Sequence, residues 1–450
     1  MRTKARFSLS TTQIILLSFL MVILAGSLLL SLPFSSADGR GVPYIDALFT
    51  ATTATCVTGL VTVTTATAWS PFGQVVILLL IQIGGLGVIT VVSWLLLLMH
   101  RRLGLRDNLL LQDAFNLNSL SGLSHFVKRV VAGTLVIEGV GAALYMTVFV
   151  PQFGLRGVWI SVFNSVSAFC NAGMDIIGST SLYDYATHPL VNAVTAALIV
   201  LGGIGYIVWW DVLRVLRTPG GRRWRRLTLH SKIVLATTVL LIFGGAAVLL
   251  ASEYHNPATI GEMGLWDKIQ VCLFQSVTTR TAGFASIPQE ELTNVSALTC
   301  ILLMFIGGSP VGTAGGIKTA TLAVLAASAF CTITGRRQVT LFGRTLSDDT
   351  LRKSMAVVGM SFTILFLSTL ALCGVTGAPF LDVLYETASA TATVGLTRGI
   401  TPLLNLWGKI IVIVTMYFGR IGPISLAIAL NVRRENVNAI QNPTEEISVG

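Results

Sequence analysis

The sequence predicts an all-α integral membrane protein with eight transmembrane helices. These form four M1–P–M2 repeats, each a helix, a short pore helix and a second helix, with pseudo-fourfold symmetry around a central pore. Three observations predict this fold. Of the 450 residues, 53% are hydrophobic and only 11% are charged, which is typical of chains whose main solvent is lipid. Long apolar stretches recur along the chain, and a shorter stretch ending at a glycine lies within each pair.

Eight apolar stretches are long enough to cross a bilayer, which takes about 20 residues. They cover residues 14–32, 72–100, 130–150, 190–213, 233–251, 297–306 with its continuation, 355–374 and 406–430. The first follows three basic residues but is long for a secretory signal and lacks a small-residue cleavage site, so it is interpreted as a span. An even number of spans places both termini on one side of the membrane.

The distribution of charge predicts which side of the membrane each loop occupies. Most of the 30 Lys and Arg residues fall in residues 101–129, 214–232 and 336–353 or near the two ends of the chain. The positive-inside rule assigns these segments, and so both termini, to the cytoplasmic side of a plasma membrane. The opposite loops are richer in Asp and Glu, which either attract cations or reflect ordinary topology. The net charge of +10 therefore does not indicate nucleic acid.

The short stretches form a fourfold internal repeat. Each contains Ser or Thr and ends at Gly59, Gly173, Gly283 or Gly395, and these glycines are 110 to 114 residues apart. The stretches are too short to span a bilayer, so each is predicted to be a re-entrant hairpin in which a pore helix enters and extended backbone returns. One such glycine alone would more simply be a packing or turn residue, but the recurrence favours a shared site.

This recurrence divides the chain into four repeats and a tail. The repeats are expected at residues 1–126, 127–231, 232–352 and 353–434, and the tail at 435–450.

The chemistry of the predicted site comes from the backbone. Glycine permits conformations in which consecutive carbonyl groups point the same way, and rings of carbonyl oxygens can replace the hydration shell of K⁺. Pore helices with Asp46 and Asp382 in their first turns would direct their negative ends at the pore centre. The candidate selectivity filter, and the K⁺ site, comprises Val57, Thr58, Gly59, Asn171, Ala172, Gly173, Thr281, Ala282, Gly283, Thr393, Val394 and Gly395.

A glycine-rich break recurs in each following span, 24 to 29 residues after the filter glycine. The breaks begin at Gly84, Gly202, Gly307 and Gly419. In the first two, close helix packing is favoured over a hinge. In the third, five glycines and a proline exclude a continuous helix, and unwound backbone at that depth must line a cavity. The candidate gate comprises Gly307, Gly308, Ser309, Pro310, Gly312, Thr313, Gly315, Gly316, Lys318 and Arg420.

Four charged residues within apolar segments are functional candidates, because the bilayer does not tolerate exposed charge. Arg420 is suited to bracing the carbonyl groups of the 307–316 loop. Lys318 either faces the interior or extends its amine to the cytoplasmic surface. Arg280 is expected to pair with a pore-helix carboxylate or carbonyl, and Glu138 is interpreted as a structural partner of a neighbouring span rather than a coupling site.

Two other classes of function fit less well. A secondary carrier with inverted repeats predicts units of opposite topology, whereas these four units keep one orientation. A membrane-embedded enzyme needs converging reactive groups, but the five histidines all lie in loops or at span ends, and the six cysteines show no metal-binding spacing. No cofactor is therefore expected in this chain.

Six segments together resemble the Trk/Ktr/HKT superfamily of K⁺ transporters, and within it the membrane subunits of bacterial Ktr systems. They lie at residues 45–51, 81–87, 279–284, 315–318, 393–396 and 419–423, and the similarity runs from residue 45 almost to the C-terminus. Cys170, Met174 and Pro310 depart from the family pattern.

The resemblance implies several properties beyond those derived from the residues. It implies a homodimer in the bacterial plasma membrane and Na⁺-stimulated K⁺ uptake, with K⁺ as substrate and Na⁺ as activator. It also implies a gating loop at 307–316 beside Arg420. A cytoplasmic ring of RCK-type nucleotide-binding subunits, which bind ATP or ADP, would control this gate, and the basic segments 101–129 and 214–232 are natural docking surfaces for it.

Overall fold

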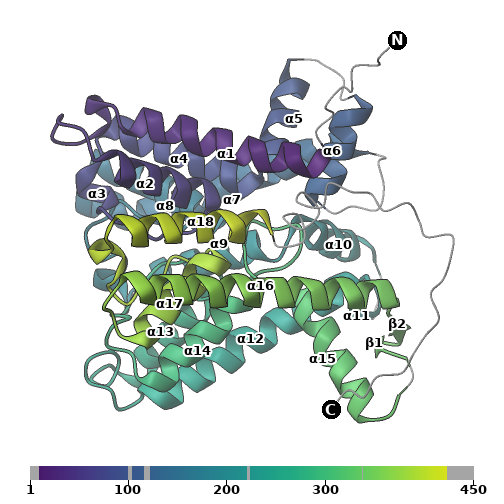
Figure 1. Ribbon diagram of the computed structural model, residues 1–450. Coiled ribbons are helices and arrows are strands. Elements are labelled where there is room, and N and C mark those ends of the chain that lie inside the picture. Colours follow the sequence, from purple (N-terminus) through teal and green to yellow (C-terminus); the bar gives the residue numbers. More distant parts are fainter. Residues whose placement is uncertain (1–9, 100–103, 116–121, 220–222, 337, 423–450) are drawn as a thin grey trace.

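The computed structural model describes residues 10–99, 104–115, 122–219, 223–336 and 338–422, and its regular structure is almost entirely helical (Figure 1). The strands in this part of the chain form one short hairpin, β1 (Thr340–Leu341) with β2 (Arg344–Thr345). The expectations for residues 1–9 and 423–450, including the sidedness of both termini and the tail at 435–450, lie outside the described residues.

Four helices are individually long and apolar enough to cross a membrane. They are α1 (Thr11–Leu30), α7 (Leu123–Phe153), α12 (Leu229–Glu253) and α16 (Asp348–Val375). Ser10, Thr228 and Ser347 cap three of them, because each side chain accepts a hydrogen bond from a first-turn N–H. α7, α12 and α16 begin before the predicted apolar runs, so the expected divisions at residues 127, 232 and 353 fall just inside these helices.

A shorter helix of 13 to 16 residues follows each long one. These helices are α2 (Tyr44–Cys56), α8 (Leu155–Cys170), α13 (Leu265–Thr278) and α17 (Phe380–Ala392). At about 1.5 Å per residue, they are about 20 to 24 Å long and cannot cross the roughly 30 Å hydrocarbon layer. Asp46, Asp267 and Asp382 lie in the first turns, where the positive end of the helix dipole stabilises a carboxylate.

Four further helices follow the short ones, and two of them end at sharp bends. The four are α4 (Pro71–Leu86), α9 (Pro189–Gly203), α14 (Asn294–Phe305) and α18 (Leu406–Ile421). α4 meets α5 (Val88–Leu98) at 98°, and α9 meets α10 (Tyr206–Arg217) at 100°. Gly87 and Gly205 lie at these bends with φ of 86° and 88°, a region that favours glycine.

These bends correct the prediction for the first two glycine-rich breaks. The helix changes direction within each break, which the sequence analysis did not expect. The close packing that it did expect is present at the first glycine of each break. A Cβ added to Gly84 would lie 2.0 Å from the Thr55 oxygen, and one added to Gly202 would lie 2.0 Å from the Phe169 oxygen.

The number of membrane spans agrees only in part with the predicted eight. By length and composition, the described helices include four candidate spans, or up to six if each bent pair counts as one. The third pair is divided by a loop between α14 and α15 (Thr319–Ile333), which leaves two helices that are short for a span. α18 ends at Ile421, and the structure describes the chain only to residue 422.

Smaller elements connect these helices. They are α3 (Thr65–Ala68), α6 (Leu105–Phe115), α11 (Arg223–Arg226), η1 (Pro33–Ser35), η2 (Tyr183–Tyr185) and η3 (Thr401–Leu403).

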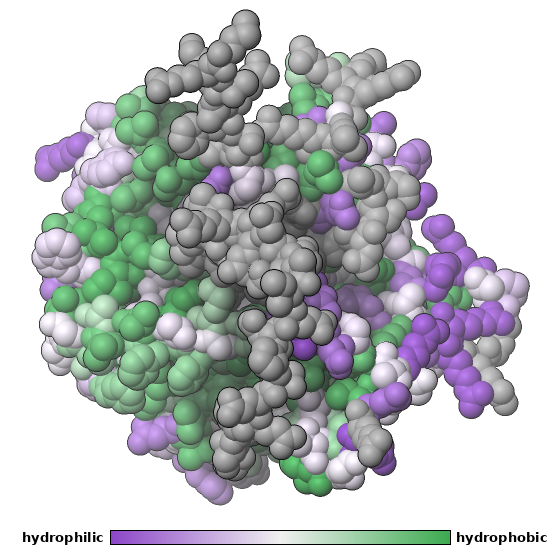
Figure 2. Space-filling view, turned by 45° about the vertical axis from the view of Figure 1, so that its right-hand side comes forward, coloured by the Kyte–Doolittle hydropathy of each residue, from purple (hydrophilic) through white to green (hydrophobic). Residues whose placement is uncertain are grey.

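The surface and the core differ as expected for a protein solvated by lipid. Figure 2 shows hydrophobic residues over much of the visible face, with strongly hydrophilic residues gathered on one side. Leu240, Val136 and Leu370 on the long helices are 62 to 71% exposed. The pore helices are instead buried over most of their length, including their Ser and Thr residues. The polar centre of the protein is therefore enclosed by the apolar helices.

Candidate ion pathway

The four segments predicted as the filter meet in a closed ring, although more than 100 residues separate each from the next. A Cβ added to Gly59, Gly173, Gly283 or Gly395 would lie 2.3 to 2.5 Å from a backbone oxygen of the following segment. Those oxygens belong, in order, to Ala172, Ala282, Val394 and Thr58. Each segment therefore touches the next, and the fourth touches the first.

All four segments share one backbone conformation. Each filter segment has three residues. The first of them has a left-handed backbone conformation, with φ of 52° to 68° at Val57, Asn171, Thr281 and Thr393. The glycine two residues later has φ of 63° to 102°. Residues with a side chain rarely adopt the left-handed region, so its fourfold recurrence identifies a specific turn at the end of each pore helix.

Hydroxyl groups of the pore helices hold this turn, a role that the sequence analysis missed. In three segments, the hydroxyl of Thr53, Ser167 or Ser389 accepts a hydrogen bond of 2.9 to 3.1 Å from a backbone N–H of the turn. In the third, the Thr278 hydroxyl donates to the Phe284 oxygen at 2.7 Å. A residue with a hydroxyl group lies six residues before the glycine in three of the four repeats. This recurrence in the sequence could have indicated the role.

The carbonyl groups of the twelve predicted filter residues are the distinctive feature of the ring. All twelve residues are buried, and none of their backbone oxygens accepts a hydrogen bond from the described part of the chain. The N–H groups of the middle residues instead bond back to the pore helices at 2.8 to 2.9 Å. An unpaired buried carbonyl is costly. Twelve of them in one ring form the kind of ligand set that replaces water around a cation.

The break between α14 and α15 is non-helical, as its five glycines and proline predict. Its backbone folds back on itself, since the Gly308 N–H donates to the Gly315 oxygen at 3.3 Å. It also joins the end of α9: the Ser309 N–H donates to the Gly203 oxygen at 2.8 Å, and the Thr313 N–H to the Gly202 oxygen at 3.1 Å. The 307–316 loop is thus an ordered segment with specific partners.

This loop lies against the fourth filter turn and the end of the second pore helix. A Cβ added to Gly315 would lie 2.0 Å from Thr393 Oγ1 of the fourth segment. Thr313 Oγ1 donates to the oxygen of Phe169, near the end of the second pore helix, at 3.1 Å. The structure therefore places the predicted gate residues next to the predicted filter.

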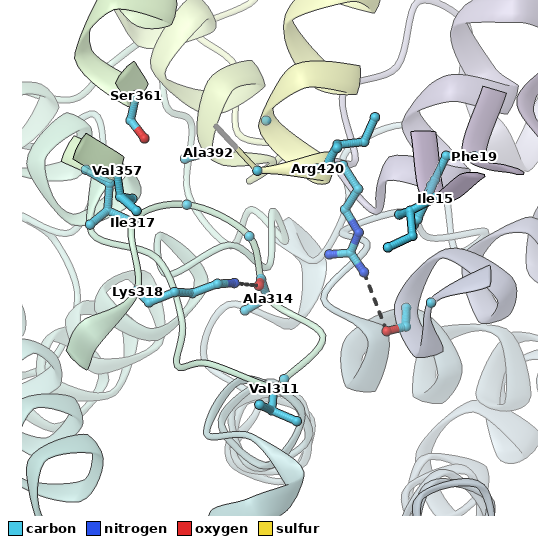
Figure 3. A pocket seen from close by; sticks show the side chains of 18 of the residues that line it. Ile15, Phe19, Val311, Ala314, Ile317, Lys318, Val357, Ser361, Ala392 and Arg420 are labelled. Atoms are coloured by element: carbon cyan, nitrogen blue, oxygen red, sulfur yellow. Dashed lines mark hydrogen bonds between the residues drawn. The ribbon is translucent and has the colours of Figure 1, made fainter. Parts of the chain in front are cut away.

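Arg420 connects the loop to the rest of the ring. It lies near the end of α18, and its Nη1 donates to the Thr313 oxygen at 2.5 Å. Its Nη2 donates to the Gly84 oxygen on α4 at 2.5 Å. Figure 3 shows the guanidinium reaching across the space between these elements. Because it keeps its proton, it can hold both carbonyl groups at once.

A cavity of about 320 Å³ lies beside the loop and Arg420. Its lining comes from α1, α4, α5, α10, α14, α16, α17 and α18 as well as the loop. Lys318 also lines it, and Lys318 Nζ donates to the Ala314 oxygen at 2.6 Å (Figure 3). Of the two predicted placements of Lys318, the structure shows the interior one.

Comparison with known proteins identifies the family. The sequence profile of the family described as "TrkH: Cation transport protein" matches residues 3–440. The chain belongs to the TrkH family. This family comprises cation transport proteins rather than enzymes, and the apolar helices make this member a multi-pass membrane protein.

Several TrkH-family relatives are similar to this chain over nearly their whole lengths. The "Potassium/sodium uptake protein NtpJ" of Enterococcus hirae is 36% identical, over 100% of this chain and 99% of the relative. The "Ktr system potassium uptake protein B" of Bacillus subtilis is 37% identical (97% and 96%), and that of Vibrio alginolyticus is 38% identical (97% and 94%). The resemblance to Ktr membrane subunits found in the sequence is thus confirmed.

A solved structure of the family shows the same fold. The crystal structure of the potassium transporter TrkH from Vibrio parahaemolyticus aligns with a TM-score of 0.74 at 18% identity. The alignment covers 96% of this chain and 86% of that one.

Two further charges of this TrkH-family member lie behind the ring. Glu138 accepts a hydrogen bond from Gln82 Nε2 at 3.3 Å and contacts Cys170 Sγ at 3.8 Å, so it joins α7 to α4 and α8. Arg280 Nη2 lies 3.5 Å from the Gly307 oxygen. Arg280 was expected to pair with a pore-helix carboxylate or carbonyl, but its contact is with the 307–316 loop.

Two ion pairs that the sequence analysis did not foresee lie at the first turns of pore helices, and their basic residues also connect neighbouring repeats. Lys409 Nζ on α18 pairs with Asp46 Oδ1 on α2 at 2.6 Å, which links the fourth segment to the first. Arg398 Nε pairs with Asp382 Oδ1 at 2.6 Å, and its Nη2 donates to the Glu290 oxygen at 2.9 Å, which links the fourth to the third. Lys409 lies 363 residues from Asp46, and Arg398 lies 108 residues from Glu290, so no local pattern indicated these links between repeats.

Proposed function

We propose that this chain carries K⁺ into a bacterial cell through a selectivity filter formed by its four re-entrant segments. The observation that carries the proposal is the ring of twelve buried, unpaired carbonyl groups. Such oxygens suit a dehydrated monovalent cation, whose charge is low enough for neutral ligands. The printed names of three relatives, which describe potassium or potassium/sodium uptake, support K⁺ as the substrate.

The proposal includes the eight-span arrangement as four M1–P–M2 repeats around a pseudo-fourfold axis. The four long helices, the four short helices that are each followed by a left-handed residue and a glycine, and the four following helices support it. On this topology, the outer membrane surface lies at the first turns of the pore helices and the basic segments face the cytoplasm, where both termini are also proposed to lie.

Regulation by an intramembrane gate is part of the same proposal. The 307–316 loop contacts the fourth filter turn and the end of the second pore helix, which supports a place on the path of an ion that leaves the filter. We propose that Na⁺ stimulates transport, that the chain forms a homodimer, and that a cytoplasmic ring of RCK-type subunits opens the gate according to bound ATP or ADP. The name "Ktr system potassium uptake protein B" describes one component of a system, which supports a partner subunit.

Growth and uptake measurements test the proposed function. The chain would be expressed, with and without a co-encoded nucleotide-binding partner, in cells that lack K⁺ uptake systems. We expect growth on low-millimolar K⁺ and faster K⁺ uptake when Na⁺ is added. If the protein is present in the membrane but uptake is absent under every ionic condition, the proposal fails.

External pH should modulate this uptake through Asp175. Asp175 follows Gly173 by two residues and lies in the loop that leaves the second filter turn, outside the membrane-spanning helices. Burial raises its pKa to about 6. The carboxyl group is charged above that pH and neutral below it, so acidification removes a negative charge from the pore entrance. One negative charge near the entrance of a pore changes the local K⁺ concentration about two- to threefold.

We therefore expect the apparent K⁺ affinity to be about two- to threefold lower at external pH 5 than at pH 7.5. The Asp175→Asn variant should show the lower affinity at both pH values, while Asp184→Asn, at an exposed position of the same outer region, should behave like wild type. An unchanged pH response in Asp175→Asn would contradict this assignment.

A further inference from the structure

One of the four repeats lacks a contact that the other three share. In the first, second and fourth repeats, a glycine of the following helix packs against a carbonyl near the end of a pore helix. Added Cβ atoms at Gly84, Gly202 and Gly419 would lie 2.0, 2.0 and 2.3 Å from the oxygens of Thr55, Phe169 and Thr391. Each of these oxygens lies two residues before the first residue of its filter turn. Direct backbone contact thus fixes the distance between helix and filter.

The third repeat replaces this contact with a side chain. Gly307 occupies the equivalent place in the sequence, but the backbone nearest to its added Cβ is Gly315 of its own loop, at 2.0 Å. The Gly307 oxygen instead accepts a hydrogen bond from Arg280 Nη2 at 3.5 Å. Arg280 directly precedes Thr281, the first residue of the third filter turn.

Arg280 is unusual for its position. The equivalent residues in the other repeats are Cys56, Cys170 and Ala392, all small and buried. The Arg280 side chain is only 7% exposed, and its Nε has no hydrogen-bond partner in the described part of the chain. A buried guanidinium with so few partners is costly. Simple packing would be satisfied by a small residue, as in the other three repeats.

The surroundings of Arg280 belong to the elements that meet the loop. Arg280 borders a small cavity of about 10 Å³ together with Gly203, Gly308 and Thr238. The Thr238 hydroxyl also has no partner in the described part of the chain. The space suits one water molecule, which would bridge these two polar groups. Gly308 lies in the loop, and Gly203 accepts the hydrogen bond from the loop residue Ser309.

We propose that Arg280 is a positioning residue that couples the third filter turn to the 307–316 loop, so that displacement of the loop alters the filter. The inference rests on the proposed function and adds a link between gate and filter. Arg280 holds the start of the loop at Gly307, while Arg420 holds its middle at Thr313. Of the two, only Arg280 is joined by a peptide bond to a filter residue, Thr281. Movement of the loop therefore reaches the filter through Arg280 and not through Arg420.

Ion flux through the purified full-length protein in liposomes tests this link. Two quantities would be measured without any soluble partner: the K⁺ flux and the ratio of K⁺ to Na⁺ flux. We expect Arg280→Met, which keeps the length but removes the charge, to raise K⁺ flux about three- to tenfold and to lower the K⁺/Na⁺ ratio by a similar factor. Arg280→Lys should restore part of both changes, because it keeps the charge.

Two control variants separate the roles. Arg420→Ala should raise the flux and also change the K⁺/Na⁺ ratio, because the loop is then free to move while Arg280 still connects it to the filter. Cys170→Ala, at the equivalent position of the second repeat, should leave the flux low, since Cys170 makes no hydrogen bond to the loop. In the double variant Arg280→Met/Arg420→Ala, the rise in flux should be less than the product of the two single effects.

The link is overturned if Arg280→Met changes neither quantity, changes the flux alone, or combines multiplicatively with Arg420→Ala. Size-exclusion chromatography in detergent confirms that each variant is folded. The proposed function fails separately, if neither wild type with its partner in cells nor Arg420→Ala in liposomes passes K⁺.

Discussion

Replacing Gly395 by Ala should strongly lower the apparent affinity for K⁺ and the selectivity over Na⁺ while leaving the protein folded. Gly395 has φ of 102°, and its added Cβ would lie 2.3 Å from the Thr58 oxygen and 2.9 Å from the Gly59 Cα. The methyl group therefore collides with the neighbouring segment of the ring. Both colliding atoms belong to backbone that is already fixed by the Thr53 carbonyl and hydroxyl, so the ring must open locally.

The expected size of this effect follows from backbone strain and displaced ligands. A residue with a side chain costs about 1 to 2 kcal/mol in a left-handed conformation, and the steric clash adds to this. Since 1.4 kcal/mol corresponds to a factor of ten, the apparent K⁺ affinity should fall by at least about tenfold. Initial rates of K⁺ uptake over a range of external K⁺ concentrations measure this change, and parallel Na⁺ uptake measures the loss of selectivity.

Gly178→Ala is the matched control for Gly395→Ala. Gly178 lies in the loop after the second filter turn, and nothing lies within 4 Å of its added Cβ. This variant should transport like wild type. If Gly395→Ala retains wild-type affinity and ion preference in correctly assembled protein, the assignment of the ring as the filter is wrong.

The pore helices and the filter turns could be predicted because they repeat. One stretch such as residues 46–59 has an ordinary composition, but four evenly spaced stretches that each end in a glycine do not arise from helix packing alone. The same comparison could have identified Thr53, Ser167 and Ser389, whose hydroxyl groups recur at one distance from the glycine. The loop could be predicted from composition, since five glycines and a proline are incompatible with a helix.

Other features could not be predicted because different structures share one sequence signal. Gly84 and Gly87 lie in the same glycine-rich break, yet the first packs against a carbonyl and the second forms a bend of 98°. Both roles need a residue without a Cβ, so only the fold separates them.

The ion pair between Lys409 and Asp46 could not be predicted for a different reason. It joins residues near opposite ends of the chain, and no local pattern encodes it.

The buried arginines show the same limit. Sequence alone identified Arg280 and Arg420 as charges that the bilayer would not tolerate. Their partners are backbone carbonyl groups of glycines and a threonine in other segments. The sequence predicted that Arg420 braces the 307–316 loop, and its bond to Thr313 agrees with this. Backbone acceptors have no side-chain signature, so the structure was needed to show that Arg280 also reaches the loop.

Substituting Arg420 by Ala should raise the flux of K⁺ through the protein in the absence of any activating partner. Arg420 donates to the Thr313 oxygen in the loop and to the Gly84 oxygen in α4, both at 2.5 Å. Hydrogen bonds from a charged donor contribute about 1.5 to 3 kcal/mol each. If the bond to Thr313 exists only while the loop obstructs the pathway, its loss favours the open state by roughly 10- to 100-fold.

Flux of K⁺ or Rb⁺ into proteoliposomes that contain the purified chain alone measures this effect. Arg420→Lys should give an intermediate flux, because one ammonium group cannot reproduce the fork that reaches both carbonyl groups. Arg344→Ala, at an exposed position in the β1–β2 hairpin, controls for general loss of basic charge and should match wild type.

Deletion of residues 308–314 extends this test to the loop as a whole. If the loop is the barrier, its removal should raise the flux at least as much as Arg420→Ala, and adding Arg420→Ala to the deletion should have no further effect, since Thr313 is then absent. A folded deletion variant with unchanged or lower flux would show that the loop does not obstruct the pathway. In that case Arg420 would act only as a structural link between the ends of α18 and α4.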